Sequence, residues 1–126
     1  MPFVQLYLPE RFDNKRIDNI SEAVHTSLID VFAIPPKDYF QVVHSLKKEH
    51  LRYPDEYMNI PHTDDLIYVH ITARHGRTVE MKQRLYSSIA NKIATSTGCS
   101  INDVVIVLSE NAPENWSFGQ GIAQYV

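Results

Sequence analysis

The stretch LIYVHITA, residues 66–73, decides how this chain is predicted to fold. Apolar and mixed side chains alternate along it: Ile67, Val69 and Ile71 on one side, and Tyr68, His70 and Thr72 on the other. Because successive side chains of a strand point to opposite faces, this alternation predicts a β-strand. One face of its sheet should be covered by apolar packing, and the other should stay mixed in character.

A helix and a further strand are predicted directly after this stretch. Thr78 can cap the first turn of the helix, and Gly98 lies where the helix should end. Between them an apolar residue recurs every four positions: Met81, Leu85, Ile89 and Ile93. This spacing places the four on one helical face. The next strand, residues 103–110, has the apolar centre VVIVL and is therefore expected to be buried on both faces.

The first part of the chain shows the same order of elements. Residues 3–8 and 40–46 are apolar runs typical of strands. Asp13 can cap the helix between them, and Pro35-Pro36 should stop it. Its apolar stripe follows spacings of three and four residues: Ile17, Ile20, Val24, Leu28 and Val31.

The two parts coincide when one is shifted by 65 residues, since Val4 falls on Val69 and residues 36–43 fall on residues 101–108. We therefore predict an α/β (α+β) fold, a tandem β-α-β repeat that gives a four-stranded mixed sheet. Parallel crossovers are almost always right-handed, so both helices should cover one face. The domain should span residues 1–126, with units at about 2–46 and 66–110 and a C-terminal tail over 111–126.

Composition excludes several classes of function. The chain has 126 residues, 12 Lys+Arg against 15 Asp+Glu and a net charge of −3, so no nucleic-acid partner is expected. The single cysteine, Cys99, excludes a disulfide framework and a multi-cysteine zinc site, and we expect no metal. No apolar run approaches the roughly 20 residues of a membrane helix. We expect no signal peptide, because the first residues, MPFVQ, lack a basic start followed by an apolar stretch. We expect a cytoplasmic protein with no membrane partner.

Several short motifs follow one another in a specific order and spacing: a proline directly after Met1, PPKD at 35–38, GRTVEMK at 76–82, NDVV at 102–105 and NWSFGQGIAQY at 115–125. Together they resemble the tautomerases related to 4-oxalocrotonate tautomerase. The chain is most similar to the fused two-unit members, and among these to malonate semialdehyde decarboxylase. The resemblance implies an enzyme without a cofactor that acts on small oxo or enol carboxylic acids. It also implies a homotrimer.

Pro2 is the first candidate for catalysis. Removal of Met1 would expose a secondary amine, and burial or nearby cations could lower its pKa toward neutrality. Such an amine could act as a base, or as an acid while protonated. Asp38 matches the catalytic aspartate of the decarboxylase, where it would hold the amine protonated or orient a water. On its residues alone Asp38 is equally a turn residue before a strand, as Asp103 is at the repeat position.

Arg74 and Arg77 are the candidates for holding the substrate. Two guanidiniums near a strand end can clamp a carboxylate with paired hydrogen bonds, and both would lower the pKa of a nearby amine. Two residues separate these arginines, as in cis-3-chloroacrylic acid dehalogenase, whereas the decarboxylase has one. The individual role of each arginine therefore stays open.

Aromatic residues are the candidates for the wall of the site. Trp116, Phe118 and Tyr125 could form an apolar wall that assists loss of carbon dioxide, or they could pack between subunits. Tyr39 could donate a hydrogen bond to the substrate or simply pack.

The predicted activity is keto-enol tautomerisation, decarboxylation of a 3-oxo acid such as malonate semialdehyde, or both. One alternative is a non-catalytic trimeric binding protein of the same fold. Another is an enzyme similar to the 3-haloacrylate dehalogenases. It is weaker because Leu28 stands where that family has a histidine on the first helix, and His25 lies nearly one turn away.

Overall fold

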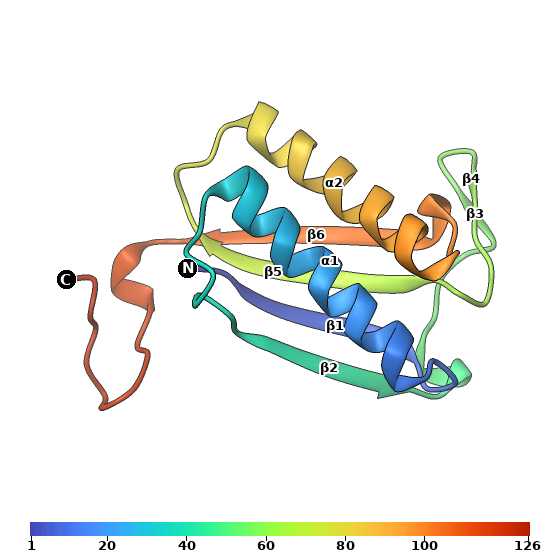
Figure 1. The fold of residues 1–126 in the computed structure, drawn as a ribbon, viewed down its shortest axis with the longest axis horizontal. Coiled ribbons are helices and arrows are strands. Elements are labelled where there is room, and N and C mark those ends of the chain that lie inside the picture. Colours follow the sequence, from blue (N-terminus) through green and yellow to red (C-terminus); the bar gives the residue numbers. More distant parts are fainter.

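The fold is built on one mixed sheet in a computed structural model that describes residues 1–126. The strands β1 (Phe3–Pro9), β2 (Gln41–Leu46), β5 (Ile67–Arg74) and β6 (Val104–Asn111) lie in the order β2-β1-β5-β6. Within each half the two strands are parallel, whereas β1 and β5 are antiparallel at the centre. Both helices, α1 (Asn14–Phe32) and α2 (Val79–Thr97), cover one face (Figure 1). The predicted fold class is confirmed.

The 65-residue repeat holds at the level of individual residues. Val4 pairs with Gln41 in the first half, and 65 residues later Val69 pairs with Ile106. The bounds of α1 shifted by 65 are the bounds of α2. The same shift carries the short 3-10 helix Lys48–His50 onto Pro113–Asn115. The connection after β2 and the C-terminal tail are therefore counterparts.

Local capping fixes where the helices begin and end. Asp13 accepts a hydrogen bond from the backbone N–H of Arg16 at 2.9 Å, and Thr78 accepts one from Met81 at 3.2 Å. Gly98 ends α2 in the left-handed region with φ +79°. Such a cap satisfies backbone groups that the helix leaves unpaired. Neither helix is long and apolar enough to cross a membrane.

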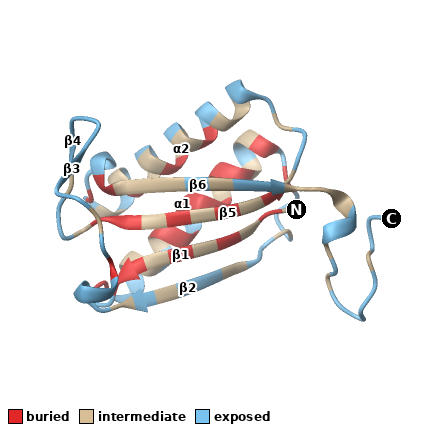
Figure 2. Ribbon diagram, turned by 180° about the vertical axis from the view of Figure 1, so that it is seen from behind, coloured by how far each residue is buried: buried red, intermediate tan, exposed pale blue.

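The core lies between the helices and the sheet (Figure 2). Ile67, Val69 and Ile71 of β5 are fully buried, as the alternation predicted. Both helices contribute fully buried residues from their predicted stripes, including Leu28 and Ile89. Burying one such side chain contributes about 1.5–3 kcal/mol, so this layer supplies most of the stability.

The expected burial of the last strand on both faces is wrong for the single chain. β6 is an edge strand, and Val107 at its centre is 52% exposed. The helices cover only one face of the sheet, so the opposite face of β6 has no cover. On the other edge strand Val42 is 41% exposed. A small hairpin, β3 (Glu56–Tyr57) and β4 (Ile60–Pro61), projects from the connection between the two halves.

Candidate active site

The predicted site residues come from four segments that meet at one end of the sheet. Because β1 and β5 are antiparallel, the start of β1 lies beside the end of β5, and Phe3 pairs with Thr72. Pro2 is buried immediately before β1, and Arg74 is the last residue of β5. The C-terminal tail begins at the same end, where the N-terminus also lies (Figure 1).

The N-terminal amine lies within the fields of three predicted site residues. Its burial and the Arg77 charge hold the pKa of the Met1 amine below its ordinary value. Asp38 acts in the opposite direction, and Arg74 again lowers the pKa. The chain begins at Met1, so the nitrogen of Pro2 is part of a peptide bond until Met1 is removed. The charges that would tune a prolyl amine are thus already in place.

The two arginines are held by packing and by one hydrogen bond. The Arg77 guanidinium lies 4.8 Å from the ring centre of Phe32 and donates to the carbonyl of Arg74 at 2.9 Å. The Arg74 guanidinium lies 4.9 Å from the ring centre of Tyr125. Burial and the neighbouring Arg74 charge lower the pKa of Arg77, although arginine stays charged at any physiological pH. Two like charges so close to each other favour a bound anion, since an anion relieves their repulsion.

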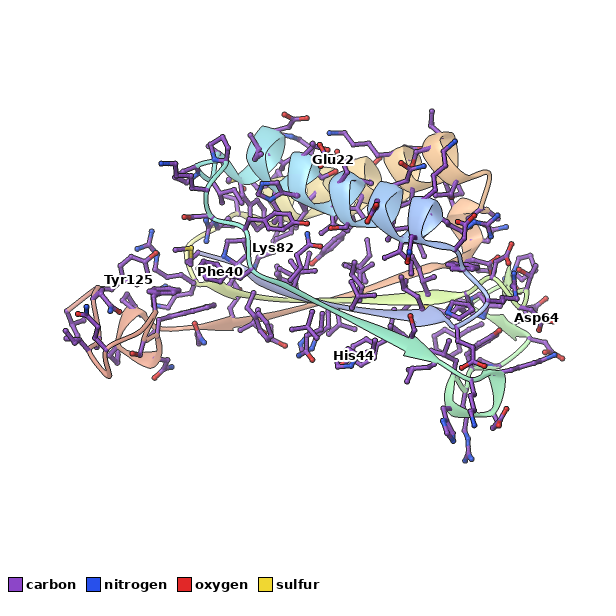
Figure 3. The ribbon with its side chains drawn as sticks, turned by 60° about the horizontal axis from the view of Figure 1, so that its bottom comes forward. Glu22, Phe40, His44, Asp64, Lys82 and Tyr125 are labelled. Atoms are coloured by element: carbon purple, nitrogen blue, oxygen red, sulfur yellow. The ribbon has the colours of Figure 1, made fainter.

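The tail supplies a continuous aromatic wall. Phe118 is at its centre, with ring-centre distances of 5.6 Å to Trp116, 5.5 Å to Tyr125 and 5.8 Å to Phe40. Figure 3 shows Phe40 and Tyr125 at the same end of the sheet. The indole N–H of Trp116 donates to Oδ1 of Asn111 at 2.5 Å, which ties the wall to the end of β6. An apolar wall beside two arginines strengthens their attraction for a carboxylate.

A glutamine keeps the tail folded. The side chain of Gln124 accepts from the backbone N–H of Phe118 and donates to the carbonyl of Gly119, each at 2.9 Å. These two bonds close a loop whose tight turn uses positive φ angles at Gly119 and Gly121. The tail therefore has a defined shape within the single chain.

Asp38 and Tyr39 lie on the segment before β2. Asp38 is half-buried, and its charge reaches the N-terminal amine. The hydroxyl of Tyr39 lies 2.8 Å from Oγ of Ser21 on α1. Ser21 donates its own proton to Gln41, so Tyr39 is the donor to Ser21. A hydrogen bond from Tyr39 to substrate stays a prediction, and it would require this contact to break.

The structure adds residues that the sequence did not single out. Phe32 supports Arg77, Phe40 completes the aromatic wall, and Asn111 anchors Trp116. Phe40 could have been found from the sequence, because it directly follows the candidate residues Asp38 and Tyr39. No sequence pattern around Phe32 or Asn111 indicates a role at the site, since each is defined only by the side chain that it contacts in the folded chain. No three His, Cys, Asp or Glu side chains lie close enough together to hold a metal ion.

The opposite end of the sheet has the same architecture without the same chemistry. Asp103, the counterpart of Asp38, is 1% exposed and accepts from the backbone N–H of Thr63 at 2.8 Å and from its hydroxyl at 2.5 Å. The counterpart of Pro2 is Ile67, which is inside the chain and offers no amine. At this end of the sheet, the connection between the two halves of the chain therefore lies where the N-terminus lies at the candidate site.

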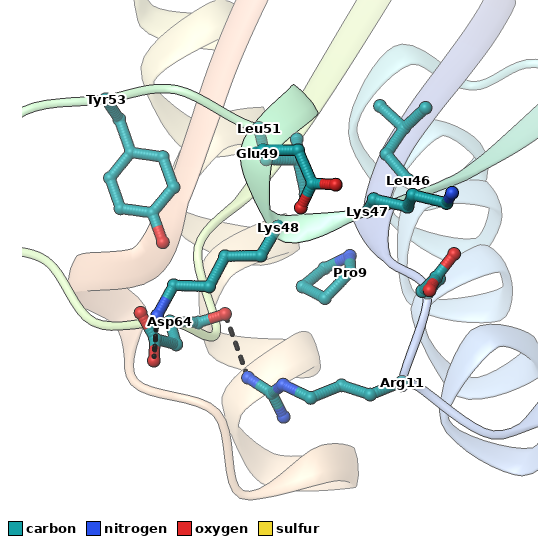
Figure 4. A pocket seen from close by; sticks show the side chains of 10 residues that line it. Pro9, Arg11, Leu46, Lys47, Lys48, Glu49, Leu51, Tyr53 and Asp64 are labelled. Atoms are coloured by element: carbon teal, nitrogen blue, oxygen red, sulfur yellow. Dashed lines mark hydrogen bonds and ion pairs between the residues drawn. The ribbon is translucent and has the colours of Figure 1, made fainter.

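A cavity of about 460 Å³ lies at this opposite end (Figure 4). Two of its cations are already paired: Arg11 with Asp65 and with the carbonyl of Asp64, and Lys48 with the Asp64 carboxylate at 3.2 Å. The residues that line this cavity include neither the N-terminal amine nor Arg74 and Arg77. We therefore place the candidate active site at the other end, where those groups meet.

Comparisons with known proteins agree with this architecture. A family model described as "Tautomerase enzyme" matches residues 38–119, and a second with the same description matches residues 2–59. The chain is 40% identical to YusQ, a probable tautomerase of Bacillus subtilis strain 168, over all 126 residues and 99% of that protein. A second probable tautomerase of that organism, YrdN, is 27% identical over 100% of this chain and 97% of its own.

Solved structures give the same picture. The chain superposes with a TM-score of 0.92 on a malonate semialdehyde decarboxylase inhibited by 3-bromopropiolate, at 32% identity over 98% of this chain and 93% of that one. A fused 4-OT named as a symmetric trimer superposes with a TM-score of 0.79 over 95% of this chain and 94% of that one. Its identity is 15%, so this second likeness concerns the fold alone.

Proposed function

The chain belongs to the tautomerase superfamily of enzymes, and on that premise we propose that it uses the Pro2 amine to move a proton within a small oxo or enol carboxylic acid. One observation carries this proposal. The groups that act on the chain's N-terminal amine are Arg77, Asp38 and Arg74, which are the residues needed for a carboxylate clamp and an acid–base pair.

The amine would be formed by removal of Met1. An α-amino group ordinarily titrates at about 7.7–8.0, and a prolyl amine is somewhat more basic. Burial and the two guanidiniums at this place lower an amine pKa, which would bring that of Pro2 closer to neutrality. A group titrating near the working pH is suited to both accept and return a proton.

Tautomerisation would then proceed in two proton transfers. Arg74 and Arg77 bind the substrate carboxylate, and the free Pro2 amine takes a proton from the enol oxygen or from the carbon beside the carbonyl. The electron pair of the broken bond forms the enolate, and the new N–H is the proton that the amine returns at the other position. No cofactor takes part in these steps.

Decarboxylation is a second candidate, favoured by Asp38 and by the likeness to a malonate semialdehyde decarboxylase at 32% identity. Asp38 raises the pKa of the amine and would keep part of it protonated. A protonated Pro2 could polarise the carbonyl of a 3-oxo acid while the C–C bond to the carboxylate breaks. Carbon dioxide leaves, the electron pair passes to the enolate, and the amine donates the proton that replaces it. The aromatic wall would disfavour a solvated carboxylate.

The test is an activity panel on protein whose Met1 removal has been verified by intact mass. Phenylpyruvate enol, 2-hydroxymuconate and malonate semialdehyde distinguish the two reactions. Pro2→Ala leaves a primary amine and should lower activity at least tenfold, about 1.4 kcal/mol of transition-state stabilisation. Unchanged turnover by correctly processed Pro2→Ala protein would remove Pro2 from the mechanism. A folded, processed protein that turns over none of the three compounds would favour the binding-protein alternative.

A dehalogenase is the less favoured enzyme class. Leu28, at the position where that family has its histidine, is 1% exposed and belongs to the core between the helices and the sheet. His25 lies on the same helix, but its ring is engaged with the carbonyl of Pro36. Activation of water by either residue would need a different arrangement of α1.

We also propose that three copies of the chain form the active assembly. His44 lies on the sheet face away from the helices (Figure 3), where its ring stacks on Tyr7 with centres 4.6 Å apart. By strand alternation and register, the exposed Val42 and Val107 lie on the same face. Exposed apolar and aromatic residues gathered on one sheet face are typical of a subunit interface. Light scattering at micromolar concentration should give close to three times the 14.5 kDa chain mass. A stable, active monomer would contradict the trimer.

A further inference from the structure

His25 is a buried side chain to which the proposed chemistry assigns no role. It lies on α1 and is 9% exposed. Its Nε2 is 2.9 Å from the carbonyl oxygen of Pro36, so this nitrogen carries the proton that it donates. The edge of its ring meets the ring of Tyr39, with centres 4.6 Å apart and an interplanar angle of 85°. One residue thus holds the chain on both sides of Asp38.

A second attachment lies one turn earlier on α1. Tyr39 donates to Oγ of Ser21 at 2.8 Å, and Ser21 donates to Oε1 of Gln41 at 2.5 Å. The amide of Gln41 donates in turn to the carbonyl of Ser21 at 3.2 Å. Every polar group of this cluster has a partner, which favours a single arrangement of the segment.

Asp38 lies between these attachments and has little else to fix it. Its backbone N–H donates to the carbonyl of Pro35 at 2.9 Å, which shapes the turn without joining it to the rest of the fold. We propose that His25 is a positioning residue, which holds the segment 35–39 against α1 and so fixes the Asp38 carboxylate relative to the N-terminal amine. This inference rests on the proposed function of that amine.

The position of Asp38 matters because the amine lies between opposing charges. Arg77 and Arg74 lower its pKa, Asp38 raises it, and burial strengthens each interaction. A Coulomb interaction falls with distance, so a displaced carboxylate would no longer offset the two guanidiniums. Loss of His25 should therefore lower the pKa of the Pro2 amine, a result that a general loss of packing does not predict.

The experiment is a titration of processed protein labelled with ¹⁵N at proline, read by NMR at Pro2, together with kcat/KM across pH. His25→Phe keeps an aromatic ring and removes the donor, and it should lower the amine pKa and lower the pH at which kcat/KM rises. His25→Gln places an amide donor near the position of Nε2 and should restore both values. If His25→Phe does not fold, Ser21→Ala removes the second attachment and should shift the pKa in the same direction.

His62 offers a matched control. Its Nδ1 lies 2.8 Å from the carbonyl of Pro54, and its ring meets Tyr53 edge-on with centres 6.1 Å apart. It therefore makes the same kinds of contact in the connection, far from the amine. His62→Phe should leave the pKa of Pro2 and kcat/KM unchanged.

A double-mutant cycle tests whether His25 acts through Asp38. Asp38→Asn alone should lower the amine pKa, and adding His25→Phe should lower it no further. An unchanged pKa in folded His25→Phe, or a full additional shift in the Asp38→Asn background, would overturn the positioning role while leaving the proposed function intact. If Asp38→Asn itself leaves the amine pKa unchanged, the proposed role of Asp38 is wrong and the inference falls with it.

Discussion

Replacement of Arg77 by alanine tests the carboxylate clamp and the tuning of the amine in one variant. The guanidinium is half-buried and fixed by Phe32 and by the carbonyl of Arg74, so it is preorganised for an anion. A hydrogen bond to a charged group contributes about 1.5–3 kcal/mol. Its loss should lower kcat/KM for carboxylate substrates by about 10- to 150-fold. If the bond is equally strong in the bound substrate and in the transition state, the variant should show a higher KM and an unchanged kcat.

The same variant should change the pH profile in a defined direction. Arg77 is the strongest charge that lowers the pKa of the N-terminal amine, so Arg77→Ala should raise that pKa. A raised pKa leaves less free amine at neutral pH, and the rise of activity with pH should move to higher pH. Arg77→Lys keeps the charge but loses the planar fork, so its amine pKa should stay low while kcat/KM still falls.

Arg84→Ala is the control, because Arg84 is exposed on α2, the helix that begins two residues after Arg77, and forms none of these contacts. Steady-state kinetics across pH and a thermal denaturation curve are measured for all three variants. Normal kcat/KM in Arg77→Ala, or an equal loss in Arg84→Ala, would refute the clamp. An amine pKa that falls in Arg77→Ala would refute the electrostatic argument.

Three further predictions concern the fold and the tail. Ile89→Ala removes a fully buried side chain between helix and sheet and should cost about 2–5 kcal/mol in urea unfolding; a loss below 1 kcal/mol would contradict its place in the core. Gly98→Ala puts a Cβ at φ +79° and should destabilise by about 1–2 kcal/mol, whereas an unchanged unfolding midpoint would mean that α2 ends differently. Trp116→Phe removes the donor to Asn111 but keeps the aromatic wall, so it should lower kcat/KM less than Trp116→Ala does; equal losses would show that the hydrogen bond, not the wall, is what matters.

Much of the fold was predictable because it depends on neighbours in the sequence. The alternation around Val69 and the stripe around Ile89 are local patterns, and the caps at Thr78 and Gly98 act within one turn of their helix. The 65-residue repeat then fixed the topology, since two β-α-β units of one kind build one sheet. The exposure of β6 was not predictable from its apolar residues, because the burial of a strand depends on which elements cover it.

The two aspartates at the repeat positions separate what the sequence determined from what the tertiary structure decided. The sequence by itself determined the repeat and placed Asp38 and Asp103 at equivalent points before a strand. The tertiary structure gave them opposite surroundings. Asp103 is buried and bound by Thr63, whereas the charge of Asp38 acts on the N-terminal amine, as do the charges of Arg74 and Arg77. The physical reason is that a carboxylate's role depends on which donors and charges reach it through space, and those come from segments far away along the chain.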